Sequence, residues 1–325
     1  ESAGATEEGV GDSEAPKHKL FEMGALARAR ISATDDTKAV MDQIRSRGAW
    51  RALVQVPENY AETSAGLARV FPNFLEFIGD HLVPQLALSR LSEQRRFALT
   101  PILLVGPPGI GKTSFCENLS SALGVPFQRV NLEAAQAGFE ITGVARGWTS
   151  AGPGRLLRWL AGNIPVNGIF VMEELDKAGG DARYDPKAPL LQLLEDTTVK
   201  TFCDQSMPEV EFDLSPISFM FTANTLEGLS APLLDRMTVV EIPSMSADQA
   251  REAAQRQYLL LLKKFNLVET PPALTEAALE SLSLESPRRQ RQLLRLALGR
   301  AIAEGSSTLS IRPSQAMSRR RLGFI

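Results

Sequence analysis

Cysteine and histidine are scarce in this chain of 325 residues, which contains two of each. Cys116 and Cys203 cannot form a framework of several disulfide bonds or a four-cysteine zinc site. His18 and His81 are the only histidines in the sequence. We therefore expect no metal ion held by soft ligands.

Long apolar runs and a large net charge are also missing. The longest apolar runs, 101–105 and 258–262, are far shorter than the ~20 residues that cross a bilayer. The chain does not start with basic residues followed by an apolar stretch, so we expect no membrane contact and a cytoplasmic location. Lys and Arg number 35 against 38 Asp and Glu, and this net charge of −3 gives no whole-molecule attraction for nucleic acid.

The length and a hydrophobic content of 44% suit about two compact domains. Residues 1–16 are small and acidic, and they bury too little to offset the entropy of ordering, so a disordered tail is predicted. Residues 17–97 are predicted to form an accessory helical segment, in which Leu75, Ile78 and Leu82 recur at helical spacing.

From residue 98 to 242, short apolar runs alternate with helical stretches, which is typical of a parallel sheet with helices on both faces. The predicted strands are 102–105, 127–131, 168–172, 217–222 and 239–242. Residues 243–325 repeat apolar positions at helical spacing and end in a basic stretch. The sequence thus predicts an α/β domain at 98–242 followed by a small all-α domain at 243–325.

A phosphate-binding loop is the strongest motif. Residues 106–113 match G-x-x-x-x-G-K-[ST], with an apolar run before them and an amphipathic helical pattern after them. Glycines let successive backbone N–H groups surround a phosphate at a helix N-terminus. The predicted nucleotide-binding residues are Gly106, Pro107, Pro108, Gly109, Ile110, Gly111, Lys112, Thr113 and Ser114. The alternative is a Gly/Pro turn with an incidental lysine.

Two acids end the apolar run at 168–172. Hydrolysis of a nucleotide at a phosphate-binding loop needs carboxylates at the tip of a neighbouring strand. Glu173 is predicted to be the acid that holds Mg²⁺, and the hydroxyl of Thr113 is predicted to be a ligand of the same ion. Glu174 is predicted to act as the general base. The alternative is a pair of solvated acids at a strand end.

Two further polar residues follow in the chain. Asn224 ends the apolar run at 217–222 and is placed to orient the attacking water. Arg236 follows a Ser/Gly loop and could reach the γ-phosphate of a neighbouring subunit, where a guanidinium stabilises transition-state charge. Either residue taken alone is more often structural.

From about residue 101 to 323 the sequence resembles the AAA+ superfamily, and specifically the ATPase module of Lon proteases. The resemblance lies in five segments that follow one another in the same order and at similar spacing. These segments are GPPGIGKTS (106–114), ELDK (174–177), FDLS (212–215), TAN (222–224) and PLLDRM (232–237). The resemblance implies an AAA+ fold, a P-loop NTPase sheet followed by a helical lid.

The resemblance also implies roles for single residues. Lys112 and Thr113 belong to Walker A, Glu173 and Glu174 to Walker B, Asn224 is sensor 1 and Arg236 the arginine finger. Arg288 stands where Lon has its sensor 2 arginine; it is otherwise one more solvated arginine. Trp148 stands at the aromatic position of the central-pore loop, with burial against the helix that contains Trp159 as the alternative.

The resemblance implies ATP and Mg²⁺ as cofactors, and a homo-oligomeric ring, a hexamer, that acts on a protein substrate or partner. Two departures matter. Glu173 replaces the family's Asp, which lengthens the side chain by about one C–C bond and could weaken a metal site that needs near-ideal geometry. The chain ends at Ile325, so we expect no protease domain and no peptide-bond cleavage.

Three functions remain open at this point. The leading one is a ring that uses ATP to remodel or translocate a protein through its central pore. The second is a slowly hydrolysing scaffold that recruits a partner protein when nucleotide binds. The third and weakest is a nucleic-acid motor, because residues 286–325 hold many arginines and one acid, Glu304, but no aromatic interleaving.

Overall fold

The computed structural model describes residues 15–133, 138–163, 165–178, 187–267 and 270–311. Most of the predicted acidic tail (1–14) and the last part of the basic C-terminal stretch (312–325) lie outside the described residues. Among the helices described, none is long and apolar enough to cross a membrane.

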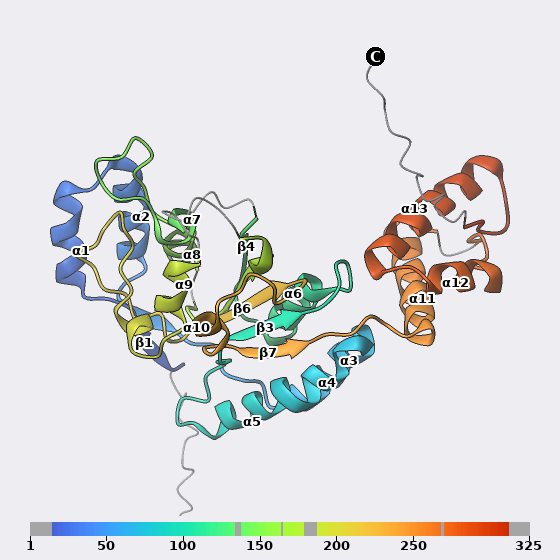
Figure 1. Cartoon of the computed structure of the whole chain (residues 1–325), viewed down its shortest axis with the longest axis horizontal. Helices are drawn as coiled ribbons and strands as arrows, with labels where there is room; N and C mark the ends of the chain where they lie inside the picture. Colours follow the sequence, from blue (N-terminus) through green and yellow to red (C-terminus); the bar gives the residue numbers. More distant parts are fainter. Residues whose placement is uncertain (1–14, 134–137, 164, 179–186, 268–269, 312–325) are drawn as a thin grey trace, which may run out of the picture.

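A parallel sheet of five strands forms the centre of the molecule, in the order β4-β5-β6-β3-β7 (Figure 1). Its strands are β3 (Ile102–Val105), β4 (Phe127–Asn131), β5 (Ile169–Glu173), β6 (Ser218–Ala223) and β7 (Thr238–Glu241). Each lies within one residue of the predicted range, so the predicted α/β fold is confirmed. These strands read as continuous apolar runs because both faces of a parallel sheet are covered.

Alternate residues of each central strand enter two separate apolar clusters. In β3, Leu103 and Val105 belong to the cluster on one face, and Ile102 and Leu104 to the cluster on the other. One face is covered by α1, α2, α8 and α9, and the other by α3, α4, α5 and α6. The bounds are α1 (Met23–Ala29), α2 (Asp35–Ser46), α3 (Tyr60–Val70), α4 (Leu75–Phe77), α5 (Val83–Leu91), α6 (Lys112–Leu123), α8 (Arg155–Gly162) and α9 (Ala188–Leu193).

The segment 17–97 is not purely helical. It contains two short antiparallel strands, β1 (Lys17–Lys19) and β2 (Trp50–Ala52), which carry no apolar run that the sequence could have signalled. Its first half packs on one face of the sheet and its second half on the other. The segment therefore forms part of both cores.

Arg51 of β2 joins this segment to the sheet domain. Its guanidinium is fully buried and donates to the carbonyl oxygens of Gly48 (2.9 Å), Ile44 (3.2 Å) and Asn163 (3.3 Å). These carbonyls lie at the C-terminal ends of α2 and α8, where the helix dipoles favour a cation. Burial lowers the pKa of Arg51 to about 10.

The predicted apolar face of the segment is only partly correct. Ile78 and Leu82 are buried, but Leu75 is 62% exposed. Phe74 takes the inward place instead and stacks on Phe115 of α6, with ring centroids 4.4 Å apart. A π-helical turn (Ile78–Leu82) lies just before Pro84, whose missing N–H disrupts the regular helical bonding.

Short elements connect the strands and the larger helices. They are η1 (Arg30–Ser32), η2 (Pro72–Phe74), α7 (Phe139–Thr142), η4 (Leu175–Lys177), η6 (Thr198–Thr201) and α10 (Ala231–Leu234).

Three helices follow the sheet and form a group apart from it, in orange and red in Figure 1. They are α11 (Ala247–Lys264), α12 (Glu276–Ser283) and α13 (Pro287–Glu304), each begun by a capping side chain, Ser246, Thr275 or Ser286. The buried Gln290 donates to the carbonyls of Ala250 (2.8 Å) and Leu282 (2.9 Å) and so ties the three helices together.

Candidate functional site

The phosphate-binding loop connects β3, a central strand of the sheet, to the N-terminus of α6. Gly111 is the residue before the helix and has φ +105°, a left-handed conformation that glycine adopts readily. Across the loop, the ring of Phe71 lies against Gly111, because an added Cβ there would meet it at 3.6 Å. The first N–H groups of α6 are thus presented beside the C-terminal edge of the sheet.

Lys112 is buried and is held by oxygen acceptors. Its Nζ donates to the carbonyls of Gly106 (2.5 Å) and Pro107 (3.0 Å) and to Oδ1 of Asn224 (3.2 Å). Burial lowers the pKa of Lys112, and the charges of Asp176 and Glu174 oppose that shift. The loop lysine and the amide at the end of β6 are therefore in direct contact.

Thr113 and Glu173 form a hydrogen bond from the threonine hydroxyl to a carboxylate oxygen. Both side chains offer hard oxygen atoms, which Mg²⁺ prefers, and their contact means that both can reach one ion. Among the described residues, no group of three or more His, Cys, Asp or Glu could hold a metal. Mg²⁺ at phosphates needs only one or two protein oxygens, so this pair fits it.

Glu174 has an unusual backbone. Its φ of 60° and ψ of 44° are left-handed, a conformation that costs a non-glycine residue about 1 kcal/mol or more. The carboxylate accepts hydrogen bonds from Lys177 (3.1 Å) and Asn131 (3.3 Å). A hydrogen bond with Glu133, together with those from Lys177 and Asn131, lowers the pKa of Glu174.

Two side chains at this edge were missed by the sequence analysis. Asp176 accepts the backbone N–H of Asn224 (3.1 Å) through Oδ2, while its buried Oδ1 has no hydrogen-bond partner among the described residues. Asn131 ends β4 and bonds Glu174. Asp176 lies in the ELDK segment and Asn131 ends a predicted strand, but neither position shows what the side chain touches.

The three-helix group also reaches the loop. An added Cβ on Gly109 would meet Oγ of Ser286 at 3.1 Å and Cβ of Arg288 at 3.6 Å. Ser286 caps α13 and Pro287 begins it, which places Arg288 in the first turn. Arg288 is therefore next to the phosphate-binding loop.

Arg236 is not part of this cluster. Its Nε donates to Glu195 (2.8 Å) and Nη1 to the Pro232 carbonyl (2.7 Å), and its side chain is exposed. Among the hydrogen bonds between described residues, none joins Arg236 to the phosphate-binding loop.

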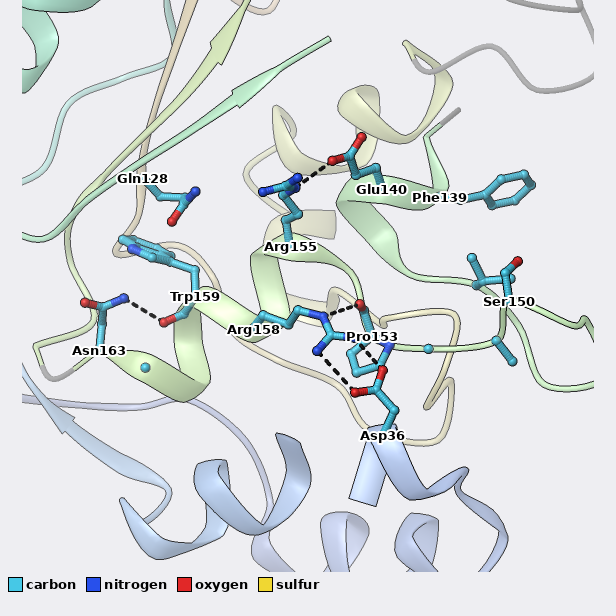
Figure 2. Close-up of a pocket in the computed structure, with 14 residues that line it drawn as sticks. Asp36, Gln128, Phe139, Glu140, Ser150, Pro153, Arg155, Arg158, Trp159 and Asn163 are labelled. Atoms are coloured by element: carbon cyan, nitrogen blue, oxygen red, sulfur yellow. Dashed lines mark hydrogen bonds and ion pairs between the residues drawn. The ribbon is translucent and has the colours of Figure 1, made fainter. Parts of the chain in front are cut away.

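Trp148 is 61% exposed, whereas Trp159 is buried. The alternative in which Trp148 packs against the helix of Trp159 is therefore wrong. Trp148 lies at the tip of a loop closed by mutual backbone bonds between Val144 and Gly152. A pocket of about 730 Å³ lies beside this loop, lined mainly by α7, α8 and residues 150–153 of the loop, and not at the phosphate-binding loop (Figure 2).

The structure thus brings Lys112, Thr113, Glu173 and Asn224 together, with Glu174 and Arg288 adjacent, and leaves Arg236 and Trp148 elsewhere. A glycine-rich loop between a buried parallel strand and a helix, with acids and an amide at the ends of neighbouring strands, defines the domain as a P-loop NTPase.

Comparison with known proteins shows what the chain is similar to. Residues 102–244 match the family described as ATPase family associated with various cellular activities (AAA). The chain is also similar to curated Lon proteases. That of Desulfovibrio desulfuricans is 38% identical over 216 residues, covering 66% of this chain and 24% of the relative. The Lon protease of Mycolicibacterium smegmatis is 34% identical, and the match covers 74% of this chain and 32% of the relative. That of Rhizobium meliloti is 31% identical, and the match covers 78% of this chain and 34% of the relative.

The chain contains an AAA module related to the ATPase part of Lon proteases. It spans about a quarter to a third of the length of these relatives.

Proposed function

We propose that the protein hydrolyses ATP with Mg²⁺, forms a hexameric ring, and uses the energy to remodel or translocate a protein substrate through the central channel. The contact of Lys112, Thr113, Glu173 and Asn224 at the C-terminal edge of the sheet is the observation that carries this proposal. Such a cluster matches the groups that phosphoryl transfer needs: a cation for the phosphates, oxygens for the metal, and a polar group for the water.

The side chains divide the chemistry between them. Lys112 and the N–H groups at the start of α6 bind the outer phosphates. Thr113 and Glu173 hold Mg²⁺, which when bound neutralises charge on the β- and γ-phosphates. Glu174 accepts the proton of the attacking water, Asn224 orients that water, and Arg288 adds positive charge from the lid.

Arg236 acts from the neighbouring subunit in this proposal. An exposed guanidinium held by Glu195 away from its own phosphate-binding loop suits a role across an interface. There it would stabilise the charge that develops on the γ-phosphate, the role of an arginine finger. The active site is then complete only in the assembled ring.

Trp148 contacts the substrate in this proposal. A large exposed indole at a loop tip offers apolar contact area that is sequence-tolerant, as a motor acting on varied polypeptides requires. Replacing Trp148 with alanine is expected to leave ATP turnover intact and to abolish remodelling. Unchanged remodelling would reject the threading mechanism.

The test of the function is native mass measurement with and without Mg-ATP, coupled to an ATPase assay with and without an unfolded polypeptide. We expect assembly with nucleotide and turnover that rises with polypeptide. A strictly monomeric protein saturated with ATP would contradict the ring. Turnover that does not change when polypeptide is added would favour the scaffold. A DNA affinity that falls steeply as the salt concentration rises would favour the nucleic-acid motor.

A further inference from the structure

The loop that carries Trp148 is closed at its base by two glycines. Gly143 has φ +82°, and a Cβ on it would overlap the carboxylate of Asp204. A Cβ on Gly154 would overlap the carbonyl oxygen of Ile141. Both ends of the loop therefore approach other groups more closely than any residue with a side chain would allow.

Asp204 lies where the two ends meet. It is fully buried, and its Oδ2 accepts the backbone N–H of Gly154 at 2.9 Å. Its Oδ1 accepts the backbone N–H (2.9 Å) and the hydroxyl (2.6 Å) of Ser206. One oxygen of the carboxylate thus holds the loop, and the other holds the turn on which Asp204 itself lies.

The segment around Asp204 makes further bonds to the same loop. The N–H of Gln205 donates to the Thr142 carbonyl (2.7 Å), and Nε of Arg146 donates to the Ser206 carbonyl (3.1 Å). Arg146 also makes a bidentate ion pair with Glu209 (2.9 and 2.7 Å). Residues 202–212, closed by mutual backbone bonds between Phe202 and Phe212, form a base for the loop.

The other side of the loop base is held from α8 and α2. Arg158 donates to the Pro153 carbonyl (3.1 Å) and pairs with Asp36 (2.5 Å), as Figure 2 shows. Pro153 and Gly154 are buried, whereas Trp148 and its neighbours at the tip are exposed. The loop is therefore fixed at its base and free at its tip.

We propose that Asp204 is a positioning residue that fixes the base of the Trp148 loop, so that grip on a polypeptide depends on Asp204 while ATP chemistry does not. The claim about grip on a polypeptide rests on the proposed function of Trp148. The claim that Asp204 fixes the loop base concerns the loop alone. Asp204 touches none of the residues that we assign to the nucleotide, and it acts on substrate only through the loop.

Asp204→Asn and Ser206→Ala form a matched pair of variants. The asparagine has the same shape but only one acceptor oxygen, so with that oxygen on Ser206 its amide N–H would face the N–H of Gly154. The alanine removes a hydrogen bond from the same carboxylate but leaves the one to Gly154. A hydrogen bond to a charged group contributes enough that its loss should raise local opening about tenfold.

The first measurement is hydrogen exchange, which requires no ATPase activity. In the wild-type protein we expect the Gly154 amide to exchange about as slowly as those of β6. Asp204→Asn should speed exchange of that amide about tenfold, and Ser206→Ala less than about threefold. A fast-exchanging Gly154 amide in the wild-type protein would overturn the proposal even if the asparagine variant did not fold.

The second measurement is ATP turnover against the concentration of carboxymethylated α-lactalbumin, an unfolded polypeptide. Asp204→Asn should raise the half-saturating concentration of polypeptide about tenfold and leave turnover without polypeptide within about twofold of wild type. If turnover without polypeptide and turnover with polypeptide fell by the same factor, Asp204 would have a general structural role and the proposal would be overturned. A wild-type protein with protected Gly154 but no turnover would refute the proposed function and leave the loop anchor standing.

Discussion

At the scale of single residues, Glu174 combines a left-handed backbone with a carboxylate held by Lys177 and Asn131. A glutamate carboxylate is ionised at neutral pH, as a proton acceptor must be, and the lowered pKa of Glu174 extends that ionised range to lower pH. Glu174→Gln should keep ATP affinity within about threefold and lower turnover by ~10²- to 10⁴-fold, the usual contribution of a general base.

Titration calorimetry and a phosphate-release assay check this prediction. Glu227→Gln, the same change on an exposed loop, is the control and should behave as wild type. Turnover in Glu174→Gln above about a tenth of wild type would assign the base to another group.

Asp204 makes the stability of the protein depend on pH. Burial raises the pKa of Asp204 from its ordinary 3.8 to about 6, although hydrogen bonds from Ser206 and Gly154 and the charge of Arg158 oppose the shift. The folded protein therefore binds this proton more tightly than the unfolded chain. The stabilisation is fully present below about pH 4 and is lost as pH rises through about 6, a change of ~3 kcal/mol.

Urea unfolding of the wild-type protein and of Asp204→Asn between pH 4 and 7 measures this effect. The free energy of unfolding of wild type minus that of the variant should fall over this range. A difference that rises with pH would show that the hydrogen bonds outweigh burial. A flat difference would place the pKa near its ordinary value.

Residue-scale contacts were the part that the sequence revealed least. The P-loop motif was sufficient to identify Lys112 and Thr113, because their spacing is tied to one backbone geometry. The contacts of Asp176 and Asp204 could not be predicted, since the sequence does not show whether an acid is solvated or buried. Their roles come from backbone N–H groups that approach from segments distant in sequence.

At the scale of elements, Arg51 holds the ends of α2 and α8 together, and no carboxylate of the described part of the chain pairs with it. Arg51→Ala would remove the guanidinium donor from one buried and two part-buried carbonyls and open a cavity. It should lower the free energy of unfolding by about 3 kcal/mol or more. Arg47→Ala, at an exposed position four residues earlier, should change it by less than about 0.5 kcal/mol.

Urea denaturation of the two variants provides the comparison. Equal stabilities would mean that the guanidinium contributes no more than a surface arginine and that α2 and α8 are held by apolar packing alone.

Elements with a strong pattern were predictable and those without one were not. Strands β3 to β7 were located within one residue, because a strand buried on both faces is continuously apolar. The pair β1–β2 was missed since Lys17–Lys19 is polar throughout and Trp50–Ala52 is too short to show alternation. Leu75 was assigned inward by spacing, but Phe74 occupies that place through its stacking on Phe115.

At the scale of the whole molecule, the two halves of the proposed active site lie apart in one chain. Lys112 contacts Asn224 at the phosphate-binding loop, whereas Arg236 is bonded to Glu195. If ATP binds between subunits, each chain supplies a pocket to one neighbour and a guanidinium to the other. Single-chain reasoning could suggest this division but could not locate the interface.

The central claim is tested most directly by the ATPase rate of a mixture of Arg236→Ala and Lys112→Ala subunits, with co-assembly confirmed by native mass. Each variant alone should be inactive. In rings assembled at random from equal amounts of the two variants, about a quarter of the interfaces pair an intact pocket with an intact guanidinium, so activity should reappear in that proportion. A co-assembled mixture as inactive as its parents would contradict an active site shared between subunits.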